Sequence, residues 1–196
     1  LLRIARENNI YVVEDASQAQ GAFYKGKRAA GLGLITPISL GPVKNLASYG
    51  DGGVVLTNDE HLADKIRLLR VHGQAEKYNH KLYGWNSRLD ELQAAVLLMK
   101  LPTLDSDNAR RREIAARFSA AFAPLPVKTP PSFADRPSVF HQYVIETAER
   151  DALRNFLHDR GVGTGIYYPT PLHRHEAWVA RGFPSCSLPE AERYSR

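Results

Sequence analysis

A short, uninterrupted apolar run near the start of the chain restricts the possible folds more than any other feature. It consists of Ile10–Val13 and is followed at once by Glu14 and Asp15. An apolar run of this length is typical of a strand buried on both faces in a parallel sheet. In open α/β sheets, ligands bind at the carboxyl ends of such strands. The sequence therefore predicts a ligand crevice near Asp15, although an Asp after a strand can instead cap a helix.

A lysine lies between two further runs with strand character. Lys44 follows Leu34–Leu40, and a glycine-rich turn at residues 50–53 leads from it into Val54–Thr57. Pro37 lies inside the first run and is expected to weaken a hydrogen bond of the sheet. A lysine at a strand end can act as a point charge for an anion or form a Schiff base with a carbonyl compound. It can equally be a solvated loop residue, so this stretch alone does not decide between them.

Apolar spacing and turn residues outline the other elements. Asp59 is expected to cap a helix, and Ser87 is expected to cap the next one together with Asp90. Residues 74–85 lack periodicity and are predicted to form an irregular loop. Helices are expected at residues 1–8, 59–71, 86–101, 103–122, 148–160 and 175–181, strands at 10–13, 34–40, 54–57, 139–146 and 164–167, and a hairpin turn at 24–28.

A proline-rich segment at residues 123–137 interrupts this pattern. Such a change in composition marks a passage to another domain. We therefore expect one domain at residues 1–122, which includes a long connecting helix, and a second at residues 123–196. The alternation of strand and helix in the second part is typical of a small α+β unit.

Composition argues against several functional classes. The chain has 196 residues, a formal net charge of +5 and a single cysteine, Cys186. One cysteine cannot form an intrachain disulfide and suits a reducing, cytoplasmic compartment. The positive charge is spread along the chain, so it does not predict nucleic-acid binding, and no apolar run is long enough to predict a membrane span. The histidines lack the spacing of a zinc site, and His173 and His175 are expected in a solvated turn, so no metal is predicted.

Three residue types predicted at one edge of the sheet point to a cofactor. They are the amine of Lys44, the carboxylate of Asp15 and the amide of Gln18. Pyridoxal phosphate sites use a lysine to bind the cofactor and a carboxylate to keep the ring nitrogen protonated. Hydroxyl or amide groups bind the phosphate or the ring oxygen. Pyridoxal phosphate is therefore the expected cofactor.

Short motifs follow one another along nearly the whole chain. They are Val13–Ala19, Lys44–Leu46, Gly50–Gly53, Asn86–Ala95, His141–Tyr143, Gly163–Gly165, Tyr168–Pro169 and Pro171–His173. Their order and spacing resemble the DegT/DnrJ/EryC1/StrS family of sugar aminotransferases. The resemblance implies the type I aminotransferase fold, an α/β fold. The chain would hold the C-terminal part of its large mixed-sheet domain and a small, incomplete α+β C-terminal domain. It also implies that a part preceding Leu1, with further cofactor-binding groups, is missing.

The resemblance implies roles for individual residues. Lys44 would form the Schiff base and shuttle protons, Asp15 would pair with the pyridine nitrogen, and Gln18 would lie beside the ring hydroxyl. Ser39 would bind the cofactor phosphate. Asn86 would reach the phosphate of a neighbouring subunit's cofactor, which implies a homodimer with shared active sites.

The resemblance also implies the reaction. An amino group, usually from L-glutamate, moves to a keto sugar carried on a nucleotide. Some members of the family have histidine in place of the lysine and carry out a dehydration, so Lys44 argues against that branch. Candidate substrate-binding residues are Arg88, His72, Tyr168 and His173.

Two other interpretations stay open. The chain can be a catalytically incomplete fragment, for which an exposed sheet edge would be expected. It can also be a regulatory or binding protein on the same fold, because a fold does not fix a function. The joint presence of Lys44, Asp15 and Gln18 argues against the second interpretation.

Overall fold

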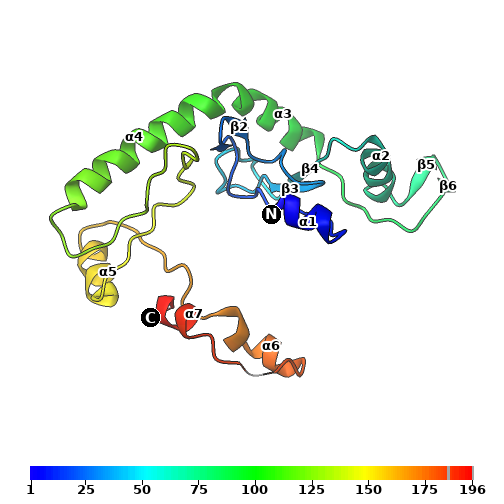
Figure 1. The fold of residues 1–196 in the computed structure, drawn as a ribbon. Helices are drawn as coiled ribbons and strands as arrows, with labels where there is room; N and C mark the ends of the chain where they lie inside the picture. The colour runs from blue at the N-terminus through cyan, green and yellow to red at the C-terminus, as the bar shows by residue number, and fades with distance from the viewer. Residues whose placement is uncertain (185, 196) are drawn as a thin grey trace. The chain divides into compact units, whose positions relative to one another are not determined.

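The computed structural model describes residues 1–184 and 186–195, which form two compact units (Figure 1). Unit 1 comprises Leu1–Ala121 and Pro131–Tyr143. Unit 2 comprises Phe122–Pro130 and the described residues after 143. The predicted boundary between residues 122 and 123 lies beside the first of these divisions, but the prediction did not include the return of residues 131–143 to unit 1. The division into two domains stays a prediction.

The sheet of unit 1 is organised around β3 (Thr36–Ser39). β4 (Gly53–Leu56) pairs with β3 in antiparallel register, with Ile38 opposite Val54. The two strands predicted on either side of Lys44 are therefore present and are direct neighbours. The segment that joins them carries the lysine.

On the other side of β3, residues 12–16 run parallel to it, as predicted. Val13 forms a parallel bridge with Ile35, and the amide of Ala16 donates to the carbonyl of Pro37 at 3.2 Å. The N–H and C=O of one strand residue face the same neighbour, so Pro37 removes a donor from this pairing. The pairing is accordingly limited to an isolated bridge and a few backbone hydrogen bonds.

The predicted burial of the apolar run at residues 10–13 is wrong for this chain. The exposed fractions are 62% for Ile10, 82% for Tyr11 and 63% for Val13. Within the described ranges, no strand pairs along the outer side of this segment. An apolar edge of this kind is a surface on which another element can pack.

Two short hairpins extend from unit 1. The predicted turn joins β1 (Phe23–Tyr24) to β2 (Lys27–Arg28), and both central residues, Lys25 and Gly26, have positive φ angles as this tight turn requires. The segment 74–85 is not wholly irregular, contrary to our expectation. It contains the hairpin of β5 (Gln74–Glu76) and β6 (Asn79–His80).

The helices that apolar periodicity predicts in unit 1 are present, but one of the predicted caps is wrong. α1 (Leu2–Glu7) and α2 (Glu60–Leu69) are present, and Asp59 caps α2 because its Oδ1 accepts from the amide of Leu62 at 3.0 Å. The cap predicted at Ser87 is wrong, since α3 (Glu91–Lys100) begins four residues later. The backbone amide of Ser87 instead donates to the carbonyl of Arg70 at 2.9 Å.

A single turn of 3-10 helix, η1 (Leu101–Thr103), links α3 to the long helix α4 (Leu104–Phe122). Pro102 lies in this turn, where its missing N–H costs no regular helical hydrogen bond. The predicted break and the predicted long helix are both confirmed.

The core of unit 1 contains several polar side chains. Asn108, Thr36 and Ser48 are each 1% exposed, and Gln20 is 5% exposed. Buried polar groups are costly unless they are hydrogen-bonded, so they show where a structure needs a defined geometry. Buried apolar residues of this unit include Ala5, Ala16, Leu40, Ala47, Leu97, Leu104, Ala115 and Val139.

Unit 2 is mostly helical and turn-like. The predicted helices are confirmed as α5 (Arg150–His158) and α6 (Glu176–Ala180), and η2 (Leu172–Arg174) and α7 (Pro189–Tyr194) complete it. The strands predicted at 139–146 and 164–167 are absent from the described chain. Residues 139–143 belong to unit 1, and Glu146 forms an isolated bridge with Lys128.

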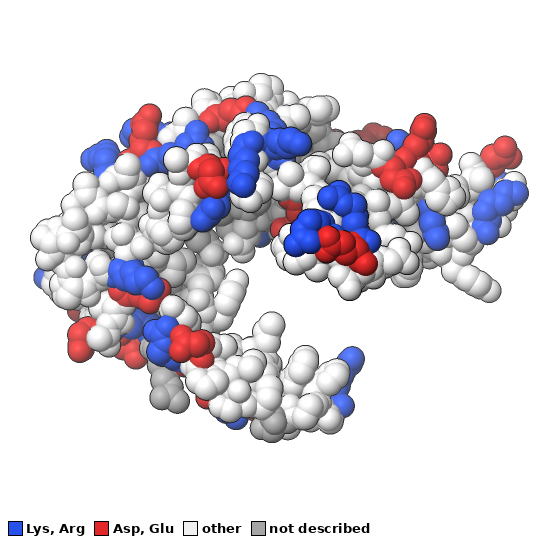
Figure 2. Space-filling model, in the orientation of Figure 1, with Lys and Arg blue, Asp and Glu red and all other residues white. Residues whose placement is uncertain are grey.

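The surface carries charges of both signs. Figure 2 shows Lys and Arg side chains interspersed with Asp and Glu on one face of the molecule. Ion pairs such as Arg28–Asp105, at 2.6 Å, are exposed, so water screens them and they contribute little to stability. Within the described residues, none of the helices has both the length and the apolar character needed to cross a membrane.

Candidate functional site

The segment that carries Lys44 folds back on itself. The amide of Lys44 donates to the carbonyl of Gly41 at 3.0 Å, which forms a turn directly after β3. Ser48 closes the segment, because its amide and its hydroxyl both donate to the carbonyl of Leu40, at 2.8 and 2.6 Å. Lys44 itself is half-buried.

Gln20 anchors this segment from the side of residues 16–22. Its Nε2 donates to the carbonyl of Ser39 at 2.7 Å and to that of Leu46 at 3.2 Å. Its Oε1 accepts from the amide of Leu46 at 2.6 Å. One buried amide therefore fixes the backbone both before and after the lysine.

Helix α3 provides a second anchor. The Oε1 of Gln93 accepts from the amide of Tyr49 at 2.7 Å, and the Nζ of Lys100 donates to the carbonyl of Ala47 at 2.8 Å. Both contacts are made after the lysine and before β4. The helix predicted from the motif at residues 86–95 thus holds the chain that leaves Lys44.

Helix α4 and the loop at 139–141 provide a third anchor through Asn45. The Nδ2 of Asn45 donates to the Oδ1 of Asn108 at 2.7 Å and to the carbonyl of Val139 at 3.1 Å. Its Oδ1 lies 3.2 Å from the Nδ1 of His141. Asn45, Asn108 and His141 were not among the predicted site residues, and neither was Gln20. The motifs Lys44–Leu46 and His141–Tyr143 are a sequence signal for Asn45 and His141, whereas no motif contains Asn108 or Gln20.

Asp15 lies at the end of the parallel segment, with an exposed carboxylate. Its Oδ1 accepts from the amide of Ser17 at 2.9 Å, and the described residues between Asp15 and β1 contain no helix, so the alternative that Asp15 caps a helix is wrong. Hydrogen bonds from the Ser17 side chain and backbone lower the pKa of Asp15, and the positive charge of Lys44 lowers it further. An ionised carboxylate therefore lies within the electrostatic reach of Lys44.

Glu14, the preceding carboxylate, organises the loop before β3. It accepts from the backbone amides of Ala30, Leu32 and Gly33 at 2.8, 2.9 and 3.0 Å. Burial alone would raise the pKa of Glu14, but these bonds, with one from Thr36, lower it on balance. Glu14 is therefore held as an anion in a structural role beside Asp15.

His141 adds a second titratable group near the lysine. Burial lowers the pKa of His141 first of all, and the positive charges of Lys44 and Arg111 lower it further. The Nη1 of Arg111, on α4, donates to the neighbouring carbonyl of Phe140 at 3.2 Å. His141 is therefore favoured as the neutral imidazole around neutral pH.

The other predicted site residues of unit 1 are more scattered. Ser39 ends β3, and its Oγ accepts from the amide of Gly41 in a long bond of 3.4 Å. Gln18 is exposed. His72, Asn86 and Arg88 are exposed on the segments that flank the β5–β6 hairpin, and their described contacts do not reach Lys44 or Asp15.

Tyr168 and His173 belong to unit 2. Tyr168 is exposed, whereas His173 is 8% exposed, so the expectation that it occupies a solvated turn is wrong. The Nε2 of His173 lies 3.1 Å from Glu192 Oε1, which also accepts from Arg174 at 2.8 Å. In unit 2 the imidazole is therefore held by a carboxylate.

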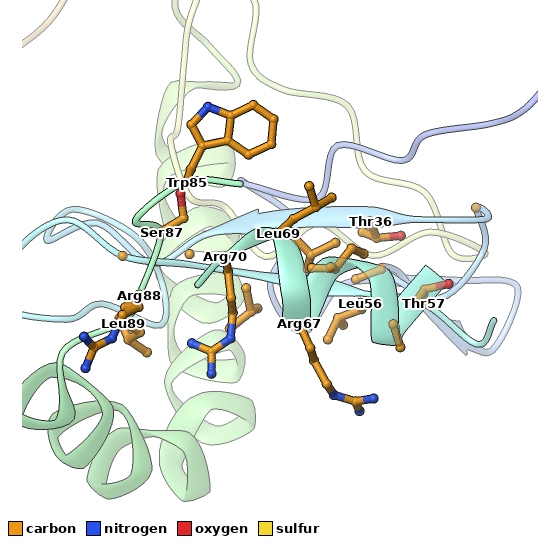
Figure 3. A pocket seen from close by; sticks show the side chains of 18 of the residues that line it. Thr36, Leu56, Thr57, Arg67, Leu69, Arg70, Trp85, Ser87, Arg88 and Leu89 are labelled. Atoms are coloured by element: carbon orange, nitrogen blue, oxygen red, sulfur yellow. The ribbon is translucent and has the colours of Figure 1, made fainter. Parts of the chain in front are cut away.

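A separate open cleft of about 1020 Å³ lies between β4, α2 and the segment before α3. Arg67, Arg70 and Arg88 extend to the same side of it (Figure 3). Lys44 and Asp15 do not line this cleft. The Lys44 turn and this cleft are thus in different places.

Comparison with known proteins identifies the chain's relatives. The family model described as the DegT/DnrJ/EryC1/StrS aminotransferase family matches residues 1–196. The chain is 45% identical to a "Pleiotropic regulatory protein" of Geobacillus stearothermophilus, over 98% of this chain and 53% of the relative. It is 42% identical to the "dTDP-3-amino-3,4,6-trideoxy-alpha-D-glucose transaminase" of Streptomyces venezuelae, over 100% of this chain and 52% of the relative.

A solved structure matches equally well. The crystal structure of S. venezuelae DesV, described as a complex with a ketimine intermediate, has a TM-score of 0.93 and 42% sequence identity. The match covers 99% of this chain and 53% of the DesV chain, so the chain spans about half the length of the relatives it matches. The expected aminotransferase fold is confirmed for this half. The chain belongs to the DegT/DnrJ/EryC1/StrS aminotransferase family.

Proposed function

We propose that this chain is the lysine-bearing part of a cytoplasmic, pyridoxal-phosphate-dependent sugar aminotransferase. The enzyme moves an amino group from L-glutamate to a keto sugar linked to a nucleotide, for amino-sugar biosynthesis. The observation that carries the proposal is the placement of Lys44, in a turn anchored from three sides and within the electrostatic reach of the Asp15 carboxylate. The transaminase name of the Streptomyces relative supports the choice of a nucleotide sugar.

The donor set of the Lys44 turn fits pyridoxal phosphate. The cofactor requires an amine, an ionised carboxylate and groups that bind an anion. Lys44 provides the amine, Asp15 is ionised at neutral pH, and the Ser39 hydroxyl lies at the end of β3. A cationic lysine beside an anionic aspartate also suits a ligand that carries both a basic nitrogen and a phosphate.

The groups of this chain divide the chemistry between them. When bound, pyridoxal phosphate supplies an electron sink for the charge left on a substrate carbon that loses a proton. The Nζ of Lys44 binds the cofactor and, when released, accepts and returns that proton. The carboxylate of Asp15, kept ionised by Ser17 and by Lys44, holds a proton on the ring nitrogen.

The remaining predicted residues complete the proposal. Ser39 binds the cofactor phosphate, and Gln18 lies beside the ring hydroxyl. Asn86 binds the phosphate of a neighbouring subunit's cofactor, so the functional unit is a homodimer. Its exposure on the segment before α3 is compatible with this role. The proposed substrate-binding residues are Arg88, His72, Tyr168 and His173.

The test uses the protein expressed from its complete reading frame. After incubation with pyridoxal phosphate and dialysis, we expect a visible absorbance band that glutamate bleaches. Lys44→Ala should lose the band, whereas Lys65→Ala, at an exposed lysine of α2, should keep it. Absence of the band in the wild-type protein, or its persistence in Lys44→Ala, would refute the proposal.

A regulatory role is the second candidate, because the Geobacillus relative, at 45% identity, is described as a regulatory protein. The same experiment separates the two functions. A protein that binds the cofactor through Lys44, but transfers no amino group from glutamate or other amino acids to any nucleotide-linked keto sugar, would favour regulation. Amino transfer to such a sugar would favour the enzyme.

A further inference from the structure

The hydrogen bonds around Asn45 have a defined direction. The Nδ2 of Asn108 lies 2.9 Å from the carbonyl of Gln20, and a carbonyl can only accept. The side-chain oxygen of Asn108 is therefore the atom that faces Asn45. Because that oxygen also can only accept, the Nδ2 of Asn45 must donate to it, and the same Nδ2 faces the carbonyl of Val139.

This direction fixes the protonation of His141. With its nitrogen turned toward two acceptors, Asn45 presents its Oδ1 to the imidazole at 3.2 Å. An amide oxygen needs a donor, so the Nδ1 of His141 must carry a proton. The neutral imidazole is therefore the Nδ1–H tautomer, and its Nε2 is unprotonated. The backbone carbonyl of Gln20 thus determines, through two amides, the tautomer of a histidine.

This series of hydrogen bonds reaches the backbone both before and after Lys44. Asn45 is the residue directly after Lys44, and Gln20 binds the backbone at Ser39 and Leu46. Asn108 is 1% exposed, so little water competes for its bonds with Asn45 and Gln20. A change at His141 therefore reaches the Lys44 turn through one side chain.

We propose that His141 is a positioning residue for Lys44, acting through Asn45 by means of its Nδ1–H group. This inference rests on the proposed function, because a defined position matters most if Lys44 is the reacting amine. The charged groups that act on His141 are Lys44 on the turn and Arg111 on α4, and the Asp15 carboxylate of the parallel segment interacts electrostatically with Lys44. Protonation of His141 would leave the bond to Asn45 intact and add a third positive charge to this cluster.

The first test measures the tautomer directly. Nuclear magnetic resonance of the ¹³C- and ¹⁵N-labelled histidines of the wild-type protein, above the pKa of His141, distinguishes the two neutral forms. We expect His141 as Nδ1–H. Finding the Nε2–H tautomer would overturn the inference, and the result does not depend on cofactor binding.

The second test separates the hydrogen bond from the charge. His141→Asn keeps a hydrogen-bond donor, because its amide nitrogen lies where Nδ1 lies, but it has no titratable group. His141→Leu has neither a donor nor a titratable group. In His141→Leu we expect backbone amides of residues 41–48 to exchange hydrogen about tenfold faster, and pyridoxal phosphate to react with Lys44 about tenfold more slowly. His141→Asn should restore both rates but lose the pH inflection below 6.5 that His141 gives the wild-type reaction.

The control is His158→Asn, at a histidine of unit 2 whose side chain is 86% exposed, and it should behave as the wild type. Wild-type rates in His141→Leu would overturn the inference. If His141→Leu fails to fold, the tautomer measurement and the rates of the His141→Asn variant test the inference instead. If the wild-type protein does not react with the cofactor, the proposed function fails, whereas the tautomer and the exchange rates still test the positioning role.

Discussion

The substitution Gln20→Leu tests whether one buried amide holds the Lys44 turn. The change removes two donated bonds, to Ser39 and Leu46, and one accepted bond from the amide of Leu46. A net hydrogen bond contributes about 1 kcal/mol, and a backbone amide left buried without a partner costs about 1–3 kcal/mol. Part of this loss is offset because leucine gains about 1–2 kcal/mol from apolar burial. The two donated bonds and the unpartnered amide together account for about 3–5 kcal/mol, so we expect a net destabilisation of about 1–4 kcal/mol.

Urea unfolding of the wild-type protein and the variant measures this loss as a shift of the midpoint at an unchanged slope. Gln18→Leu is the matched control, because Gln18 is the same residue type, two positions earlier, and exposed. It should change the stability by less than about 0.5 kcal/mol. An equal effect of the two substitutions, or a negligible effect of Gln20→Leu, would refute the assignment of the anchor to Gln20.

Three further perturbations test other parts of the structure. The folded-state pKa of Glu14 lies below 4.5, so its stabilising contribution is present above pH 4.5 and is lost as the pH falls through the folded value. When the urea midpoint is plotted against pH, Glu14→Gln should flatten the curve in this acidic range. Hydrogen bonds from Arg174, His173 and the Leu188 amide lower the pKa of Glu192 to about 2. Unit 2 should therefore lose stability as the pH falls from 4.5 to about 2. Near-ultraviolet circular dichroism, which reports on Trp178, should show that Glu192→Gln removes this loss. Gly73→Ala places a methyl group against the carbonyl of Leu82, at a positive φ of 71°, and should lower the melting temperature by several degrees. The decrease should exceed that of Gly26→Ala, whose methyl group meets no atom of the described residues within 4 Å.

Local patterns in the sequence predicted most of the elements. Strands β3 and β4 and helices α2 and α4 follow from apolar spacing and from punctuation by glycine and proline. The cap at Asp59 was found because it directly precedes an apolar stripe, whereas the cap at Ser87 was misplaced. Ser87 looks like a cap by spacing, but its amide is used in the contact with Arg70, and the helix starts only after Asp90.

The burial of a strand was harder to predict than its parallel direction in the sheet. The run at residues 10–13 reads as a buried strand, and it does run parallel to β3. Its outer side is exposed because burial depends on a neighbour that the described chain does not provide. A hydrophobic pattern predicts that a segment needs a partner, and it does not show whether that partner lies within the given chain.

Lys44 and Asp15 are proposed from the sequence as reacting groups, but the residues that support them in the structure are not. Lys44 and Asp15 follow strand ends, which is a local signal. Asn45 meets Asn108 and His141 across 63 and 96 residues of sequence, and no periodicity connects such distant positions. The same limit applies to the two glutamines of one turn, because only the folded backbone shows that Gln20 is buried and Gln18 is exposed.

The most direct test of the account is to locate the lysine that binds the cofactor. The complete protein is incubated with pyridoxal phosphate, reduced with borohydride and digested, and the peptides are analysed by mass spectrometry. We predict a reduced cofactor adduct on Lys44, formed rapidly and at one equivalent per chain. Labelling that is spread evenly over exposed lysines such as Lys65 and Lys81, with none preferred at Lys44, would contradict the account.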